Sequence, residues 1–121
     1  MTVIAGGQST LPSANYRQTF QVSLLQLAAN PSDVEWLPIA EAALRDAAAA
    51  GGQVLILPEL FRAPYFCQTM DTRQFDRAEA VPGPTTDHLS KLAAELGVVI
   101  VASLFEVAAP GLSFNTTAVL D

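Results

Sequence analysis

The stretch GGQVLILPELFRAPYFCQ, residues 51–68, decides the fold that this sequence predicts. Two glycines precede residues 53–57, a short apolar run without alternation, which is typical of a strand covered on both faces. Pro58 ends the run, and Glu59 follows at once. In open α/β sheets, sites form beyond the carboxyl ends of the strands, so Glu59 stands where a functional side chain is expected.

The residues before this stretch predict a strand and a helix. Residues 20–27 read as the strand, and Ser32 and Glu35 have the spacing of a capping box at the start of the helix. We expect the helix to reach about residue 50 and either to kink at Pro38 or to start late. Its expected apolar face consists of Ile39, Ala43, Leu44, Ala47 and Ala48, and Gly51 and Gly52 end it.

The residues after it predict a second helix and two more strands. Residues 60–84 form a long connection rich in proline, glycine and aromatic residues. Thr85 or Thr86 is expected to cap the helix, which Gly97 ends. Its apolar stripe consists of Leu89, Leu92, Ala93 and Leu96. Residues 98–105 are a buried strand, residues 108–113 a short loop, and residues 114–120 the last strand.

The order of elements predicts an α/β fold whose sheet is incomplete. Each strand–helix–strand unit implies a right-handed crossover between neighbouring parallel strands. Four strands and two helices leave open apolar edges, which intact proteins cover or pair. We therefore expect a second half or another chain to complete the sheet. Residues 1–17 are expected to be a mobile leader, and residues 18–121 part of one domain.

Composition excludes several classes of partner. The chain has 121 residues, 50% of them hydrophobic, and a formal net charge of −6. Six basic residues argue against nucleic acid and against an anionic membrane surface. The longest apolar run, residues 98–102, is far too short for a membrane span, and the leader lacks the pattern of a secretory signal. A single cysteine allows no internal disulfide, so a cytoplasmic location is expected.

Glu59 is the first candidate for chemistry. A partly desolvated carboxylate at a strand end can serve as a general base near neutral pH. The alternative is a solvated glutamate, or one paired with Arg62. Both interpretations remain open at the level of the residues alone.

Cys67 invites a nucleophile interpretation, but its setting argues against it. Activation of a thiol needs a cationic or basic neighbour, and Cys67 follows the apolar Tyr65 and Phe66. His88, the only histidine, lies on the second predicted helix, where it can simply face solvent. Phe61, Tyr65 and Phe66 either line a pocket or only pack the loop. No cysteine or histidine cluster has metal-ligand spacing, and no glycine-rich phosphate loop is present.

The same stretch also resembles a known family. Residues 51–68 resemble the first signature of the nitrilase superfamily, the carbon-nitrogen hydrolases. The resemblance extends to FQVSLLQLAANP before it, and to HLSKLAAELGVVIVASLFE and FNTTAVLD after it, so it covers about residues 20–121. Within the superfamily, ELFRAPYFCQ at residues 59–68 is most similar to the amidases that hydrolyse N-carbamoylputrescine in polyamine synthesis.

The resemblance implies an αββα sandwich, of which this chain is the N-terminal part, and a Glu-Lys-Cys triad. Glu59 matches the general base, which takes the proton of a cysteine thiol so that the thiolate attacks an amide or carbamoyl carbon. The lysine stabilises the oxyanion. The family mechanism uses no metal and no organic cofactor.

The lysine and the nucleophilic cysteine of the family lie beyond residue 121. Lys91 and Cys67 do not match them. Tyr65 matches a loop tyrosine near the family's active site and is a candidate substrate contact, and Asn115 matches an asparagine to which we assign a structural role. We therefore expect the 121-residue chain alone to be inactive.

The expected function is hydrolysis of a non-peptide C–N bond in a small carbamoyl or amide substrate, by a protein that is a homo-oligomer at full length. One rival is another amidase of the superfamily, such as an ω-amidase or a β-ureidopropionase. A second rival, of a different class, is an inactive short product that acts as an interaction module. A third is a flavodoxin-like binding domain, against which the missing phosphate loop speaks.

Overall fold

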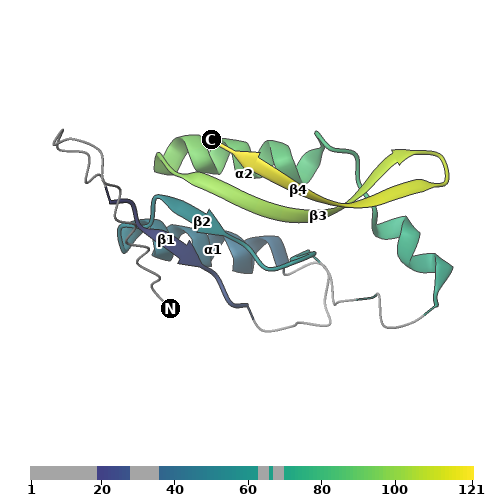
Figure 1. The fold of residues 1–121 in the computed structure, drawn as a ribbon, viewed down its shortest axis with the longest axis horizontal. Coiled ribbons are helices and arrows are strands. Elements are labelled where there is room, and N and C mark those ends of the chain that lie inside the picture. Colours follow the sequence, from purple (N-terminus) through teal and green to yellow (C-terminus); the bar gives the residue numbers. More distant parts are fainter. Residues whose placement is uncertain (1–18, 28–35, 63–65, 67–69) are drawn as a thin grey trace, which may run out of the picture.

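A computed structural model describes residues 19–27, 36–62, 66 and 70–121 (Figure 1). The expected leader and the predicted capping pair of Ser32 and Glu35 lie outside these residues. The described elements are four strands, two α-helices and one short 3₁₀ helix. They occur in the predicted order, with the 3₁₀ helix inserted in the long connection.

The four strands form one mixed sheet in the order β1-β2-β3-β4. They are β1 (Val22–Leu24), β2 (Val54–Ile56), β3 (Val99–Ala109) and β4 (Leu112–Leu120). β1, β2 and β3 run parallel, as the strand–helix–strand spacing predicted, and β4 returns antiparallel to β3.

The hairpin of β3 and β4 is longer than predicted. The expected loop of six residues shrinks to Pro110 and Gly111, because the flanking residues pair across the two strands. Gly111 has φ +77°, a conformation that glycine adopts without steric penalty. A register shift lies between Val107 and Ala109, just before the turn.

Helix α1 (Trp36–Ala49) carries Pro38 in its first turn, where the missing N–H removes no helical hydrogen bond. Trp36, Ala40 and Leu44 are its buried residues. The predicted apolar face is therefore partly wrong, because Ile39 points outward and is 40% exposed.

Helix α2 (Pro84–Leu96) confirms its predicted stripe, since Leu89, Leu92 and Ala93 are buried and Leu96 packs against them. The predicted N-cap position is wrong, although Thr86 does take part in the cap. Gly83 precedes the helix, and Thr86 acts from inside the first turn: its Oγ1 accepts from the Gly83 N–H at 2.8 Å and donates to the Gly83 carbonyl at 3.0 Å.

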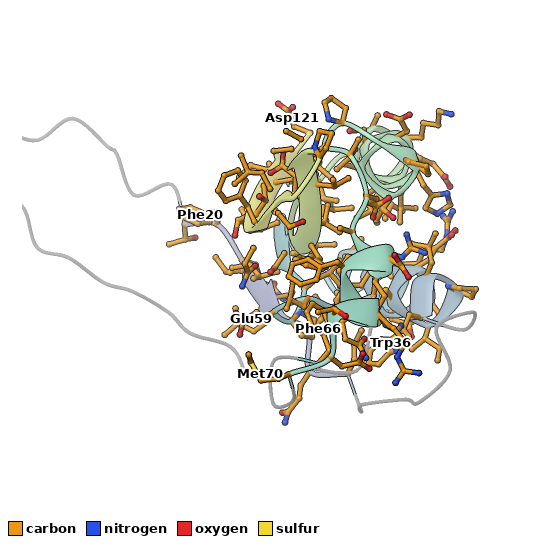
Figure 2. All side chains as sticks on the ribbon, turned by 90° about the vertical axis from the view of Figure 1, so that its right-hand side faces the viewer. Phe20, Trp36, Glu59, Phe66, Met70 and Asp121 are labelled. Atoms are coloured by element: carbon orange, nitrogen blue, oxygen red, sulfur yellow. The ribbon has the colours of Figure 1, made fainter. Side chains whose placement is uncertain are left out.

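Both helices lie on the same side of the sheet (Figures 1 and 2). The core between them and the sheet is continuous, and its fully buried members include Leu44, Leu55, Leu89 and Ile100. The strand residues that alternate with this core make up the opposite face, which we call the uncovered face: Val22, Leu24, Val54, Ile56, Val99, Val101 and Val119. The expectation that residues 53–57 are covered on both faces thus holds for one face within the described residues.

The connection between β2 and α2 is attached to β3. Its 3₁₀ helix η3 (Thr72–Arg77) is capped by Asp71, whose side chain accepts from the Arg73 N–H. Further on, Glu79 forms a parallel bridge with Glu106. No helix in the described ranges combines the length and the apolarity that a membrane crossing needs.

Candidate functional site

Glu59 lies just past the carboxyl end of β2. The N–H of Leu57 donates to the carbonyl of Val101 on β3 at 2.9 Å, and Pro58 then ends the pairing of these strands. Figure 2 shows Glu59 on the side of the sheet away from the helices. Its side chain is exposed, so the predicted partial desolvation is wrong for the described part of the chain, which leaves that face without a cover.

Three hydrogen bonds connect Glu59 to β3 and β4. The amide of Asn115 on β4 donates through Nδ2 to Glu59 Oε1 at 2.6 Å. The hydroxyl of Ser103 on β3 donates to Asn115 Oδ1 at 3.0 Å, and the N–H of Leu60 donates to Ser103 Oγ at 3.1 Å. Residues far apart in the sequence are therefore linked to Glu59 by consecutive hydrogen bonds, because the β3–β4 pairing brings Ser103 and Asn115 together.

Arg62 does not pair with Glu59. Its Nη1 donates to Glu79 Oε1 at 3.2 Å and to Thr85 Oγ1 at 2.6 Å. Glu79 in turn accepts from the Thr85 N–H through Oε2. Arg62 and Glu79 thus bind the connection between β2 and α2 to the start of α2. The alternative of a Glu59–Arg62 ion pair is wrong.

The other titratable candidates lie elsewhere. His88 on α2 is hydrogen bonded through Nε2 to Glu41 Oε2 on α1 at 2.8 Å, and Lys91 is exposed on α2. The sheet separates α2 from Glu59, so neither side chain joins the site. Tyr65 and Cys67 lie outside the described residues.

The aromatic candidates divide into two kinds. Phe61 is 1% exposed and belongs to the core, so its predicted alternative role as a pocket wall is wrong. Phe66 packs on Phe105, with ring centroids 4.9 Å apart. Both border a cavity of about 290 Å³ whose lining is Leu60, Arg62, Phe66, Asp76, Arg77, Glu79, Ser103, Leu104 and Phe105. Glu59 is not part of this lining, but Leu60 and Ser103 line the cavity and also belong to the hydrogen-bonded group that leads through Asn115 to Glu59.

Ser103 is the site residue that no sequence pattern predicted. The one signal is chemical, a hydroxyl inside the apolar strand VVIVASLF. A lone serine in a strand is ordinary, so only the pairing of β3 with β4 reveals its contact. Among the residues that the structure describes, no group of three histidine, cysteine or acidic side chains is placed to hold a metal ion.

Comparison with known proteins matches this fold to one family. The sequence profile described as "Carbon-nitrogen hydrolase" matches residues 21–121. The N-carbamoylputrescine amidase of Arabidopsis thaliana is 38% identical over 106 residues, which are 87% of this chain and 35% of that protein. The omega-amidase NIT2 of Xenopus tropicalis is 35% identical over 101 residues, covering 83% of this chain and 35% of the relative.

A solved structure agrees with the sequence comparison. The crystal structure of a carbon-nitrogen hydrolase from Helicobacter pylori G27 superposes with a TM-score of 0.75 at 31% identity, over 81% of this chain and 34% of that one. The present chain thus spans about a third of the length of the relatives that it matches. It belongs to the carbon-nitrogen hydrolase family, in the nitrilase superfamily, as its signature around Glu59 predicted.

Proposed function

We propose that the protein containing this chain hydrolyses a non-peptide C–N bond of a small carbamoyl or amide substrate, with Glu59 as the general base. The observation that carries this proposal is the hydrogen bonding of the two oxygens of the Glu59 carboxylate. Asn115 holds Oε1, and within the described residues no hydrogen-bond donor reaches Oε2. A carboxylate with one anchored oxygen and one available oxygen is suited to accept a proton from a defined direction.

In the proposed reaction, Glu59 accepts the proton of a cysteine thiol, and the thiolate adds to the carbonyl carbon of the substrate. The C–N bond then breaks, and the leaving amine or ammonia receives the proton that Glu59 took from the thiol. Water hydrolyses the thioester after giving a proton to Glu59, and the thiol is regenerated. The cysteine and the lysine that stabilises the oxyanion are residues that the family resemblance implies. Neither matches a position within residues 1–121.

N-carbamoylputrescine is the proposed substrate. The support is the name of the Arabidopsis relative at 38% identity, while the Xenopus omega-amidase follows at 35%. Because these values are close, an ω-amide belongs in the same test. An N-carbamoyl β-amino acid is added because β-ureidopropionase is the other rival within the superfamily. Ammonia release by the purified full-length protein, measured with each compound in parallel, ranks the three substrates by kcat/KM.

The role of Glu59 is tested with Glu59→Gln in the full-length protein. The amide keeps the size of the side chain and removes its basicity, so we expect kcat to fall by about 10²- to 10⁴-fold. Glu95→Gln is the matched control, because Glu95 is an exposed glutamate on α2, on the helix side of the sheet. We expect that control to stay within about twofold of wild type, since surface substitutions away from a site have small effects. A Glu59→Gln protein that keeps wild-type kcat on its best substrate refutes the assignment.

A further inference from the structure

Glu59 is held at two points, and both lead to Ser103. Its side chain reaches Ser103 through Asn115, with contacts of 2.6 and 3.0 Å. Its backbone reaches Ser103 through the N–H of the next residue, Leu60, at 3.1 Å. The four residues come from the end of β2 and from the paired strands β3 and β4.

The Leu60 N–H fixes the direction of all three hydrogen bonds between Leu60, Ser103, Asn115 and Glu59. The Leu60 N–H can only donate, so the Ser103 oxygen accepts there and its single proton is available for Asn115 Oδ1. The amide NH₂ of Asn115 then faces Glu59 and can only donate. Reversing the amide would place two acceptor oxygens 2.6 Å apart, which is repulsive. Glu59 Oε1 is thereby kept as an acceptor.

The backbone beside Glu59 is also specialised. Leu60 has φ +48°, in the left-handed region that non-glycine residues rarely adopt, and its side chain is buried at 4% exposure. Such conformations persist where surrounding contacts enforce them, and they concentrate at functional sites. Here the enforcing contacts are the burial of the Leu60 side chain and the bond from its N–H to Ser103. The direction in which Glu59 leaves β2 is therefore set by the same serine.

We propose that Asn115 is a positioning residue for Glu59 and that Ser103 orients Asn115. This inference rests on the proposed function, in which Glu59 is the base. Because Asn115 occupies Oε1 of Glu59, Oε2 is the oxygen that receives the proton from the thiol. In the protonated carboxyl group Oε1 is still an acceptor, so the hydrogen bond from Asn115 persists after the proton transfer. The carboxyl group then need not reorient between accepting and returning the proton, which preserves the reactive geometry.

Four substitutions in the full-length protein test the proposal by steady-state ammonia release. Asn115→Leu removes the donor at similar volume, and we expect kcat to fall roughly 10- to 100-fold with little change in KM. Ser103→Ala should show a smaller loss, and Ser103→Thr, which keeps the hydroxyl, should restore most of it. Thr117→Val is the control, because Thr117 pairs with Ser103 on the same face of the sheet, whereas the hydrogen bond to Glu59 within the described residues comes from Asn115.

Asn115→Asp separates positioning from a merely structural role. It places a second carboxylate against Glu59, and two adjacent carboxylates favour retention of a shared proton. We expect the acidic limb of the kcat/KM pH profile to move to higher pH. Loss of folded protein would lower the whole profile without moving this limb. An unmoved limb together with wild-type kcat in Asn115→Leu overturns the proposal.

A second readout needs no turnover and separates the two proposals. The ¹³C carboxyl chemical shift of Glu59, identified by its loss in Glu59→Gln, is compared at one pH near neutrality in wild type and in Asn115→Leu. Loss of the Asn115 donor should change this chemical shift, because the carboxylate loses a hydrogen bond and its fixed orientation. If wild type releases no ammonia from any substrate, the proposed function fails. The comparison of chemical shifts then decides the Asn115 contact alone, and equal chemical shifts refute it.

Discussion

Leu60 combines a backbone conformation that destabilises the fold with a buried side chain that stabilises it. Its left-handed conformation costs a non-glycine residue about 1–2 kcal/mol. Its side chain is almost fully buried, and removing a buried leucine usually costs about 2–5 kcal/mol. The second term exceeds the first, so a leucine is stable where glycine would be the ordinary choice for the backbone alone.

Substitution at Leu60 separates these terms. Leu60→Ala and Leu60→Gly both lose the buried side chain, but only glycine relieves the backbone. We expect both to lower the free energy of unfolding by about 2–4 kcal/mol. We also expect the glycine variant to be as stable as the alanine variant or up to about 1 kcal/mol more stable, because relief of strain exceeds the added chain entropy. Urea unfolding of the full-length protein measures this difference.

The control is the same pair at Leu89, a fully buried residue inside α2. There glycine should be the less stable of the two by about 1 kcal/mol. If glycine falls below alanine by the same amount at both positions, the left-handed backbone at Leu60 stores no strain.

The sequence predicts Glu59, and the family resemblance gives Asn115 a structural role, but neither predicts that Asn115 and Ser103 hold Glu59. The difference is physical. Pro58 and the apolar run before it mark a strand end by local composition alone. Ser103 and Asn115 reach Glu59 only through the register of β3 with β4, which places Ser103 opposite Thr117 and Asn115 opposite Phe105. Register depends on the whole hairpin, so no local pattern around either residue contains this information.

At the scale of elements, the two helices show when periodicity suffices. Leu89 and Leu92 define one direction on α2, and its buried stripe follows them. Helix α1 is rich in alanine, which is found on both buried and exposed faces of helices. Its sequence therefore predicts poorly which side of the helix faces the core. The large residues Trp36 and Leu44 determine which side packs, and Ile39 is left outside.

The helices are also joined by charges on their outer surface. Arg45 on α1 donates to both carboxylate oxygens of Glu95 on α2, at 2.7 and 3.1 Å, and to Glu41 on its own helix at 2.9 Å. His88 on α2 is hydrogen bonded to the other carboxylate oxygen of Glu41, Oε2. The hydrogen bonds from Arg45, with a smaller one from His88, hold the pKa of Glu41 below its ordinary value, and Arg45 likewise lowers the pKa of Glu95.

These shifts give stability a predictable pH dependence. A carboxyl whose pKa is lower in the folded chain stabilises the fold above its ordinary value, here 4.5, and loses that contribution as the pH falls through the folded pKa. We expect the urea midpoint to fall as the pH drops from about 5.5 to 3, and the fall to be smaller in a Glu41→Gln, Glu95→Gln double variant. The change is modest because these side chains are partly solvated.

Asp46→Asn serves as the matched control, because Asp46 is an exposed carboxylate on the same helix, outside this group of charges. It should leave the acid dependence as in wild type. A double variant whose midpoint falls as steeply as wild type contradicts the coupling of the two helices through Arg45.

At the scale of the whole molecule, the helices shield one face of the sheet and leave the other open within the described residues (Figure 2). Leu24 on one edge strand is 50% exposed, and Val119 on the other is 68% exposed. The apolar side chains of the uncovered face between them make a continuous patch. Monomeric proteins rarely present such a surface, and it favours association with another apolar surface.

The patch therefore predicts how the 121-residue chain behaves when it is produced alone. We expect its weight-average mass in sedimentation equilibrium to rise above 12.8 kDa as concentration increases. Val119→Lys should move association to concentrations roughly tenfold higher or more, because it removes about 1.5–2 kcal/mol of apolar burial and adds a charge to the contact. Ala94→Lys adds the same charge at an exposed position of α2, behind the sheet, and should associate like wild type. Equal association by the two lysine variants would place the contact elsewhere than on the uncovered face.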